Sequence, residues 1–253
     1  MNIIKKIKAK AEDNAHKEGV TLAFLGDSVT QGCFELYKKE GNVVETVFDK
    51  RHSYEAYVFE IFCMLYPTVT LNIINAGVSG DRASSGAERV ERDVLRHRPD
   101  LTVVCYGLND CAPEKTDLER YITSLGDIFD KLNDGGCDII FMTPNMMNTK
   151  ISPHLTDKDY IEIAERKAKL QNDGTLDLYV DAAKKLCGER KIPVCDCYSL
   201  WKKLHRGGVD TTELLANKIN HPTRDMNKLL AYELVRTIFD ETEKDFAKTI
   251  FTA

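Results

Sequence analysis

The chain has 253 residues, of which 43% are hydrophobic and 30% charged, and its formal net charge is -5. This composition is typical of a globular protein with a sizeable core, and the acidic balance argues against a nucleic-acid-binding surface. No apolar run approaches the roughly 18 residues of a membrane helix, so we expect no membrane span.

The first predicted element is an N-terminal helix at about residues 1–18. Its isoleucines recur at helical spacing among many lysines, which indicates an amphipathic helix rather than a signal peptide. We therefore expect a cytoplasmic protein.

After this helix, strand-like and helix-like segments alternate. Five short, nearly continuous apolar runs are typical of strands buried on both faces of a parallel sheet: Val20–Leu25, Val69–Asn75, Leu101–Tyr106, Asp138–Thr143 and Ile192–Cys195. Helical patterns follow or separate them: Arg51–Tyr66, Ser84–His97, Asp117–Asn133, Asp159–Arg190 with a break near 172–174, and Asp225–Phe246. Because right-handed crossovers place helices on both faces, the pattern predicts an α/β fold, a three-layer α/β/α sandwich.

The chain shows no repeat and no flexible linker, so we expect a single domain over residues 1–253. Residues 33–50 fit no core element and form an insert after the first strand-to-helix turn. Ligands bind beyond the carboxyl ends of parallel strands. The insert therefore either lines a site or is a solvated loop with a short hairpin around Gly41 and Asn42.

Eight cysteines show no zinc-ribbon spacing, and several lie inside apolar runs. Without a secretion signal, reduced thiols in the core are the favoured interpretation. Cys195 and Cys197 share one face of a strand, which leaves a metal site open, but no histidine cluster joins them. We therefore expect no metal there.

Four turns carry residues suited to acyl transfer. Ser28, Gly80 and Asn109 follow the first three strands, and His221 precedes the last helix. Each alone is explained by a helix cap or an ordinary turn. Together, three strand ends bring a hydroxyl, a backbone N–H and an amide to one edge of the sheet, within reach of an imidazole.

The sequence resembles the SGNH (GDSL-type) hydrolases from Leu22 to about Ala231. The resemblance rests on GDSVTQG at 26–32, NAGVSGD at 75–81, GLND at 107–110 and NHP at 220–222. It implies a flavodoxin-like five-stranded parallel sheet of order 2-1-3-4-5. It also implies hydrolysis of carboxylic esters without a cofactor.

The resemblance further implies residue roles. Ser28 is the nucleophile and His221 the general base. The oxyanion hole is formed by the N–H groups of Ser28 and Gly80 and by the side chain of Asn109. Asp27 and Asp110, next to these residues in the turns, are expected to contact the substrate.

One position departs from the family pattern. The family places an aspartate three residues before the histidine, and here that residue is Lys218. An aspartate fixes the tautomer of the imidazole and stabilises imidazolium, so its absence weakens the expected base. We favour orientation of His221 by the side chain of Asn217 or by a main-chain carbonyl. Asp210 or Glu213 is a third possibility.

The predicted function is a serine esterase for short acyl groups, such as acetyl on a sugar or a small alcohol. The partner is then a small-molecule or carbohydrate ester. A lysophospholipase or thioesterase-type acyl hydrolase is an alternative. Another is a non-catalytic ligand-binding protein on the same scaffold. Neither acyl length nor oligomeric state has a signature in the sequence.

Overall fold

Five parallel strands form the central sheet of the computed structural model, which describes residues 1–112 and 115–251. The strands are β1 (Val20–Gly26), β4 (Leu71–Gly77), β5 (Leu101–Cys105), β6 (Asp138–Met142) and β7 (Val194–Cys195). Their order is β4-β1-β5-β6-β7. Counted along the chain, this is 2-1-3-4-5, so the predicted α/β fold and strand order are confirmed.

Helices flank this sheet, and most of the longer ones fall in predicted intervals, whereas the helix at Cys197–Arg206 was not predicted. The longer ones are α1 (Ile3–Glu12), α3 (Tyr54–Leu65), α4 (Ala83–Asp93), α5 (Lys115–Asp134), α6 (Lys158–Asn172), α7 (Thr175–Arg190), α8 (Cys197–Arg206) and α9 (Arg224–Phe251). Short turns complete the set: α2 (Ser28–Gln31) and the 3-10 turns η1 (Glu40–Asn42) and η2 (Leu95–His97). The predicted break near 172–174 is real, because Gly174 adopts a φ of 81° between α6 and α7.

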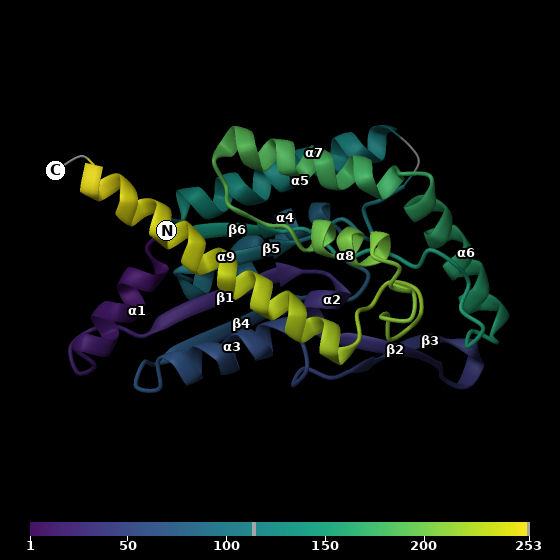
Figure 1. Cartoon of the computed structure of the whole chain (residues 1–253), viewed down its shortest axis with the longest axis horizontal. Coiled ribbons are helices and arrows are strands. Elements are labelled where there is room, and N and C mark those ends of the chain that lie inside the picture. Colours follow the sequence, from purple (N-terminus) through teal and green to yellow (C-terminus); the bar gives the residue numbers. More distant parts are fainter. Residues whose placement is uncertain (113–114, 252–253) are drawn as a thin grey trace.

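Two groups of helices cover the sheet. Helix α3 packs against α9, while α4 packs on α5 and α5 on α7. Figure 1 shows α9 crossing the near face of the sheet. Strand β1 is buried along almost its whole length, as expected for a strand with neighbours on both sides. None of the helices in the described ranges is long and apolar enough to cross a membrane.

The insert forms an antiparallel hairpin of β2 (Cys33–Lys38) and β3 (Val44–Phe48), joined through η1. Gly41 in this connection has a φ of 79°, a conformation that glycine adopts without strain. The hairpin lies beside α6 and the loop before α9, at the opposite end of the molecule from α1 (Figure 1). It therefore extends from the edge where the parallel strands end.

All eight cysteines are free thiols, as expected, and only Cys63 is not buried. The sulfur atoms of Cys195 and Cys197 lie 3.7 Å apart. In the ranges that the structure describes, no three histidine, cysteine or carboxylate side chains are grouped as metal ligands.

Candidate active site

The turn after β1 holds Ser28 at the first position of α2. Asp27 caps this short helix, because its carboxylate accepts the N–H of Val29 at 3.0 Å. Gly26 allows the turn to pack tightly, since a Cβ there would lie 2.7 Å from the carbonyl oxygen of Cys105. The Ser28 side chain is consequently fixed at the carboxyl edge of the sheet, and only 3% of the residue is exposed.

Ser28 and His221 form a hydrogen-bonded pair across 193 residues of sequence. Nε2 of His221 lies 2.9 Å from Oγ of Ser28, and Nδ1 lies 2.9 Å from the carbonyl oxygen of Phe34. Because a carbonyl oxygen only accepts, Nδ1 carries the ring hydrogen and Nε2 is left to accept the hydroxyl proton. The arrangement is that of a nucleophile, a base and an orienting acceptor.

The electrostatics of this pair favour the neutral imidazole. Burial lowers the pKa of His221 to about 4, a shift that the hydrogen bond to Phe34 only partly opposes. The ring is therefore unprotonated at neutral pH and available as a proton acceptor.

The loop before α9 shows which of the three possible orienting groups touches the ring. The side-chain oxygen of Asn217 accepts the backbone N–H groups of Ile219, Asn220 and His221, at 2.8 to 3.0 Å. It thus shapes the loop instead of contacting the imidazole. The structure does not pair Asn217 with the ring, because the carbonyl of Phe34 occupies the Nδ1 position.

The two upstream carboxylates are engaged elsewhere. Asp210 forms an ion pair with Lys150 at 2.5 Å, and Glu213 forms one with Lys218 at 2.9 Å. Lys218 has a φ of 58°, so the residue that replaces the family's aspartate sits in a left-handed turn. Of the possible acceptors, only the main-chain carbonyl is in place.

Arg224 fixes the strand that supplies this carbonyl. Its guanidinium donates to Glu35 and to Asp49, each at 2.7 Å, and lies 4.3 Å from the centre of the Phe34 ring. Arg224 follows His221 by three residues, so one side chain ties the hairpin to the histidine loop. Sequence reasoning missed both Phe34 and Arg224.

The predicted oxyanion donors lie on the wall of the same cavity as Ser28 and His221. Gly80 has a φ of 78°, in a turn that follows β4. The Asn109 amide donates to the carbonyl oxygen of Asp81 at 3.0 Å. An amide nitrogen carries two hydrogens, so Asn109 retains one for a second acceptor.

A buried ion pair supports this wall. Arg89 pairs with Asp81 at 2.6 Å and also donates to the carbonyl oxygens of Gly26 and Ala76, at the ends of β1 and β4. Arg89 thereby links the ends of the two strands that lead into the turns with Ser28 and Gly80.

Asp27 and Asp110 do not occupy the positions expected of substrate contacts. Both are buried, and neither lines the cavity. Asp110 accepts the N–H of Ala83 at 2.9 Å, as Asp27 accepts that of Val29. Burial raises the pKa of Asp27 to about 7 and that of Asp110 to about 6. The two carboxyls therefore hold the turns in shape.

The cavity at this edge has a volume of about 740 Å³. Leu36 and Val44 of the hairpin line it, so the insert contributes to the site as one of its two interpretations predicted. Four basic side chains and one acidic side chain also line it: Arg82, Arg166, Lys167, Lys169 and Asp173.

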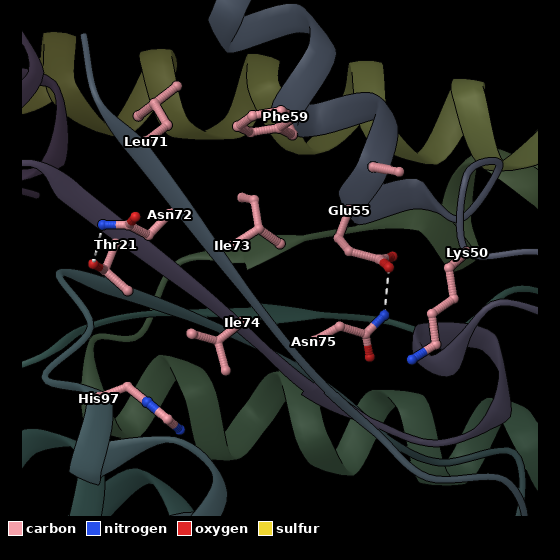
Figure 2. A pocket seen from close by; sticks show the side chains of 11 residues that line it. Thr21, Lys50, Glu55, Phe59, Leu71, Asn72, Ile73, Ile74, Asn75 and His97 are labelled. Atoms are coloured by element: carbon pink, nitrogen blue, oxygen red, sulfur yellow. Dashed lines mark hydrogen bonds between the residues drawn. The ribbon is translucent and has the colours of Figure 1, made fainter.

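A second cavity of about 720 Å³ lies along the edge strand β4 (Figure 2). Phe59 and Ile73 line it, together with Glu55, whose carboxylate accepts from Asn75. It contains His97 but no hydroxyl paired with an imidazole. The chemistry of a nucleophile and base belongs to the cavity at the strand ends.

Comparisons with known proteins identify the family. A family model described as the GDSL-like lipase/acylhydrolase family matches residues 24–229. A curated acetylxylan esterase of Geobacillus stearothermophilus is 30% identical over 92 residues, which are 36% of this chain and 40% of that protein. The chain thus matches less than half of the length of that relative.

Solved structures share the fold. The crystal structure of an acetyl xylan esterase has a TM-score of 0.65 and 20% identity, and the match covers 87% of this chain and 100% of that one. A lipase/acylhydrolase from Enterococcus faecalis has a TM-score of 0.62 and 20% identity, with 87% and 95% covered.

Proposed function

We propose that the chain, which belongs to the GDSL-like lipase/acylhydrolase family, is a carboxylic ester hydrolase that cleaves short acyl esters through a Ser28–His221 pair. The observation that carries this proposal is the hydrogen-bonded series from the Ser28 hydroxyl through the imidazole to the carbonyl of Phe34. No carboxylate takes part in it.

In the proposed mechanism, His221 takes the hydroxyl proton while Oγ of Ser28 attacks the ester carbonyl. The carbonyl oxygen becomes negative and is held by the N–H groups of Ser28 and Gly80 and by the free amide hydrogen of Asn109. Such donors act in a site from which water is largely excluded, where their effect is large. His221 then gives its proton to the departing alcohol.

The second half of the reaction uses the same groups. Water enters, His221 takes its proton, and the hydroxide attacks the acyl carbon on Ser28. Collapse of the second tetrahedral intermediate releases the carboxylic acid and returns the proton to Oγ. Asn217 acts indirectly, as a positioning residue that fixes the main chain of His221.

For the substrate we propose acetyl or a similarly short acyl group on a sugar or small alcohol. Two observations support this choice. The relatives named above include acetylxylan esterases. Leu36 and Val44 narrow the cavity from the hairpin side, and its total volume suits a sugar-sized alcohol with a small acyl group.

The proposal is tested with para-nitrophenyl esters of increasing acyl length and with a fluorophosphonate probe. We expect the acetyl ester to be cleaved fastest and the probe to label Ser28. Ser28→Ala should lose turnover and labelling. Ser79→Ala is the matched control, because Ser79 lines the same cavity but has no hydrogen bond to His221. Full activity in Ser28→Ala contradicts the proposal, and ester binding without labelling favours a non-catalytic binding protein.

A further inference from the structure

The charge of the cavity is opposite in sign to that of the chain. The whole chain has a net charge of -5, yet the cavity at the strand ends is lined by four cations and one carboxylate. His221 adds no charge there, since burial holds its pKa at about 4. A positively charged cavity in an acidic protein is a local feature that general solubility does not require.

None of these four cations forms an ion pair with a carboxylate in the described residues, and two of them are exposed arginines. Within residues 1–112 and 115–251, no carboxylate lies within ion-pair distance of Arg82 or Arg166, and both side chains belong to exposed residues. Arg224, at the back of the same site, is by contrast bound to Glu35 and Asp49. The guanidinium groups of Arg82 and Arg166 thus retain their full donor capacity.

Lys167 connects this pair of arginines to the reacting groups. Its ammonium donates to the carbonyl oxygen of Leu108 at 2.7 Å, directly before Asn109 in the chain. Burial lowers the pKa of Lys167, and the nearby positive charges of Arg166 and Arg82 lower it further. These three cations and Asn109 line the same cavity. Their mutual repulsion is relieved when an anion binds between them.

We propose that the alcohol part of the substrate carries an anionic group, a carboxylate or a phosphate, which Arg82 and Arg166 bind. The inference rests on the proposed esterase function and names the substrate class of the same site. The charge belongs to the alcohol because a short acyl group has no room for one. Arginine suits this role, since its planar fork pairs with both carboxylate and phosphate.

The test compares aryl acetates whose para substituents differ in charge. Para-acetoxybenzoate is anionic, para-acetoxybenzamide is its neutral counterpart, and para-acetoxyphenyl phosphate supplies the phosphate arm. We expect kcat/KM for at least one anionic ester to exceed that for the amide by about tenfold or more, equivalent to about 1.4 kcal/mol. The advantage should shrink in about 0.5 M NaCl, where the screening length falls to a few ångströms. The arm with the larger ratio identifies the anion.

Two variants locate the effect. Arg82→Gln and Arg166→Gln should each reduce the ratio of anionic to neutral kcat/KM several-fold. Lys8→Gln, which removes one positive charge from α1 at the far end of the molecule, should leave the ratio unchanged (Figure 1). Binding of para-acetoxybenzoate and its amide to Ser28→Ala, measured by calorimetry, gives the same comparison without turnover.

The outcomes separate the two proposals. Equal rates and equal binding of charged and neutral esters, with normal cleavage of the neutral ester, overturn the anionic substrate and leave the esterase intact. A ratio that Arg82→Gln and Arg166→Gln do not alter overturns it as well. If no ester is cleaved but the benzoate still binds more tightly than the amide to the Ser28→Ala variant, the esterase proposal fails and the anion site stands.

Discussion

The pH dependence of ester hydrolysis tests the orientation of His221 by a carbonyl instead of a carboxylate. Burial lowers the pKa of this imidazole from its ordinary 6.5 to about 4, and the hydrogen bond to Phe34 and the charge of Glu35 offset only part of that shift. The difference corresponds to about 3 kcal/mol against the protonated ring. At pH 5 an imidazole of pKa 4 is about 90% neutral, whereas one of pKa 6.5 is only about 3% neutral.

We therefore expect kcat/KM for para-nitrophenyl acetate to stay nearly constant from pH 8 to about 5 and to reach half of its maximum near pH 4. Initial rates measured at constant ionic strength, with circular dichroism at each pH to confirm folding, provide the profile. Ser28→Ala gives the uncatalysed background. A half-maximal point near 6.5 or above would refute the reasoning, because burial would then not lower the pKa of the ring.

Asp27 needs a control of its own, since its pKa of about 7 lies inside this range. Asp27→Asn keeps the acceptor for the Val29 N–H but does not titrate. A limb near pH 7 that disappears in Asp27→Asn belongs to this carboxyl.

Three further predictions concern single residues. Asn109→Ala should lower kcat by about 10²–10³ with a native circular dichroism spectrum, because one oxyanion donor is lost. Arg224→Met should lower kcat about tenfold or more while KM changes less, since the carbonyl of Phe34 is no longer held in place. Arg224→Lys should recover only part of the lost kcat, because lysine lacks the planar guanidinium that contacts both Glu35 and Asp49. Glu55→Gln should raise Tm at pH 8.5 but not at pH 5. An equal change in Tm at both pH values would contradict this prediction. The reason is that burial raises the pKa of Glu55 from 4.5 to about 7. Between these pH values the folded state keeps a proton on Glu55 that the unfolded state has lost. The wild-type protein therefore loses about 3 kcal/mol of stability as pH rises from 4.5 to 7.

The sheet could be predicted because nearly continuous apolar runs mark its strands. Runs such as Leu101–Tyr106 are apolar at almost every position, which is typical of a strand covered on both faces. The turn residues Ser28, Gly80 and Asn109 could be placed at one edge for the same reason, since all three follow parallel strands. Helix α8 was not predicted. It begins two residues after the two-residue strand β7, so no turn or linker in the sequence separates the two elements.

The acceptor for His221 had no comparable signal. A main-chain carbonyl exists at every residue, so no residue type marks Phe34. Its role depends on the path of the hairpin, which Arg224 fixes through contacts 175 and 189 residues away in sequence. The basic run at 166–169 is visible in the sequence, but there it is indistinguishable from a solvated helix face. The fold places these basic side chains of α6 on the wall of the cavity that also contains Ser28.

Replacing the aspartate by a carbonyl changes which half of the transition state the site stabilises. Attack by Ser28 creates a negative oxygen and a positive imidazole together, and an aspartate favours the imidazole. Here Lys167 lies near the ring and lowers the pKa of His221 in addition to the effect of burial, which disfavours the positive charge. The same ammonium, bound to the carbonyl of Leu108 next to Asn109, favours the negative oxygen. We infer that oxyanion stabilisation compensates for a weak base in this protein. Lys167→Met should consequently lower kcat while raising the pKa of His221, and a fall in kcat without that rise would show that the lysine acts only on packing.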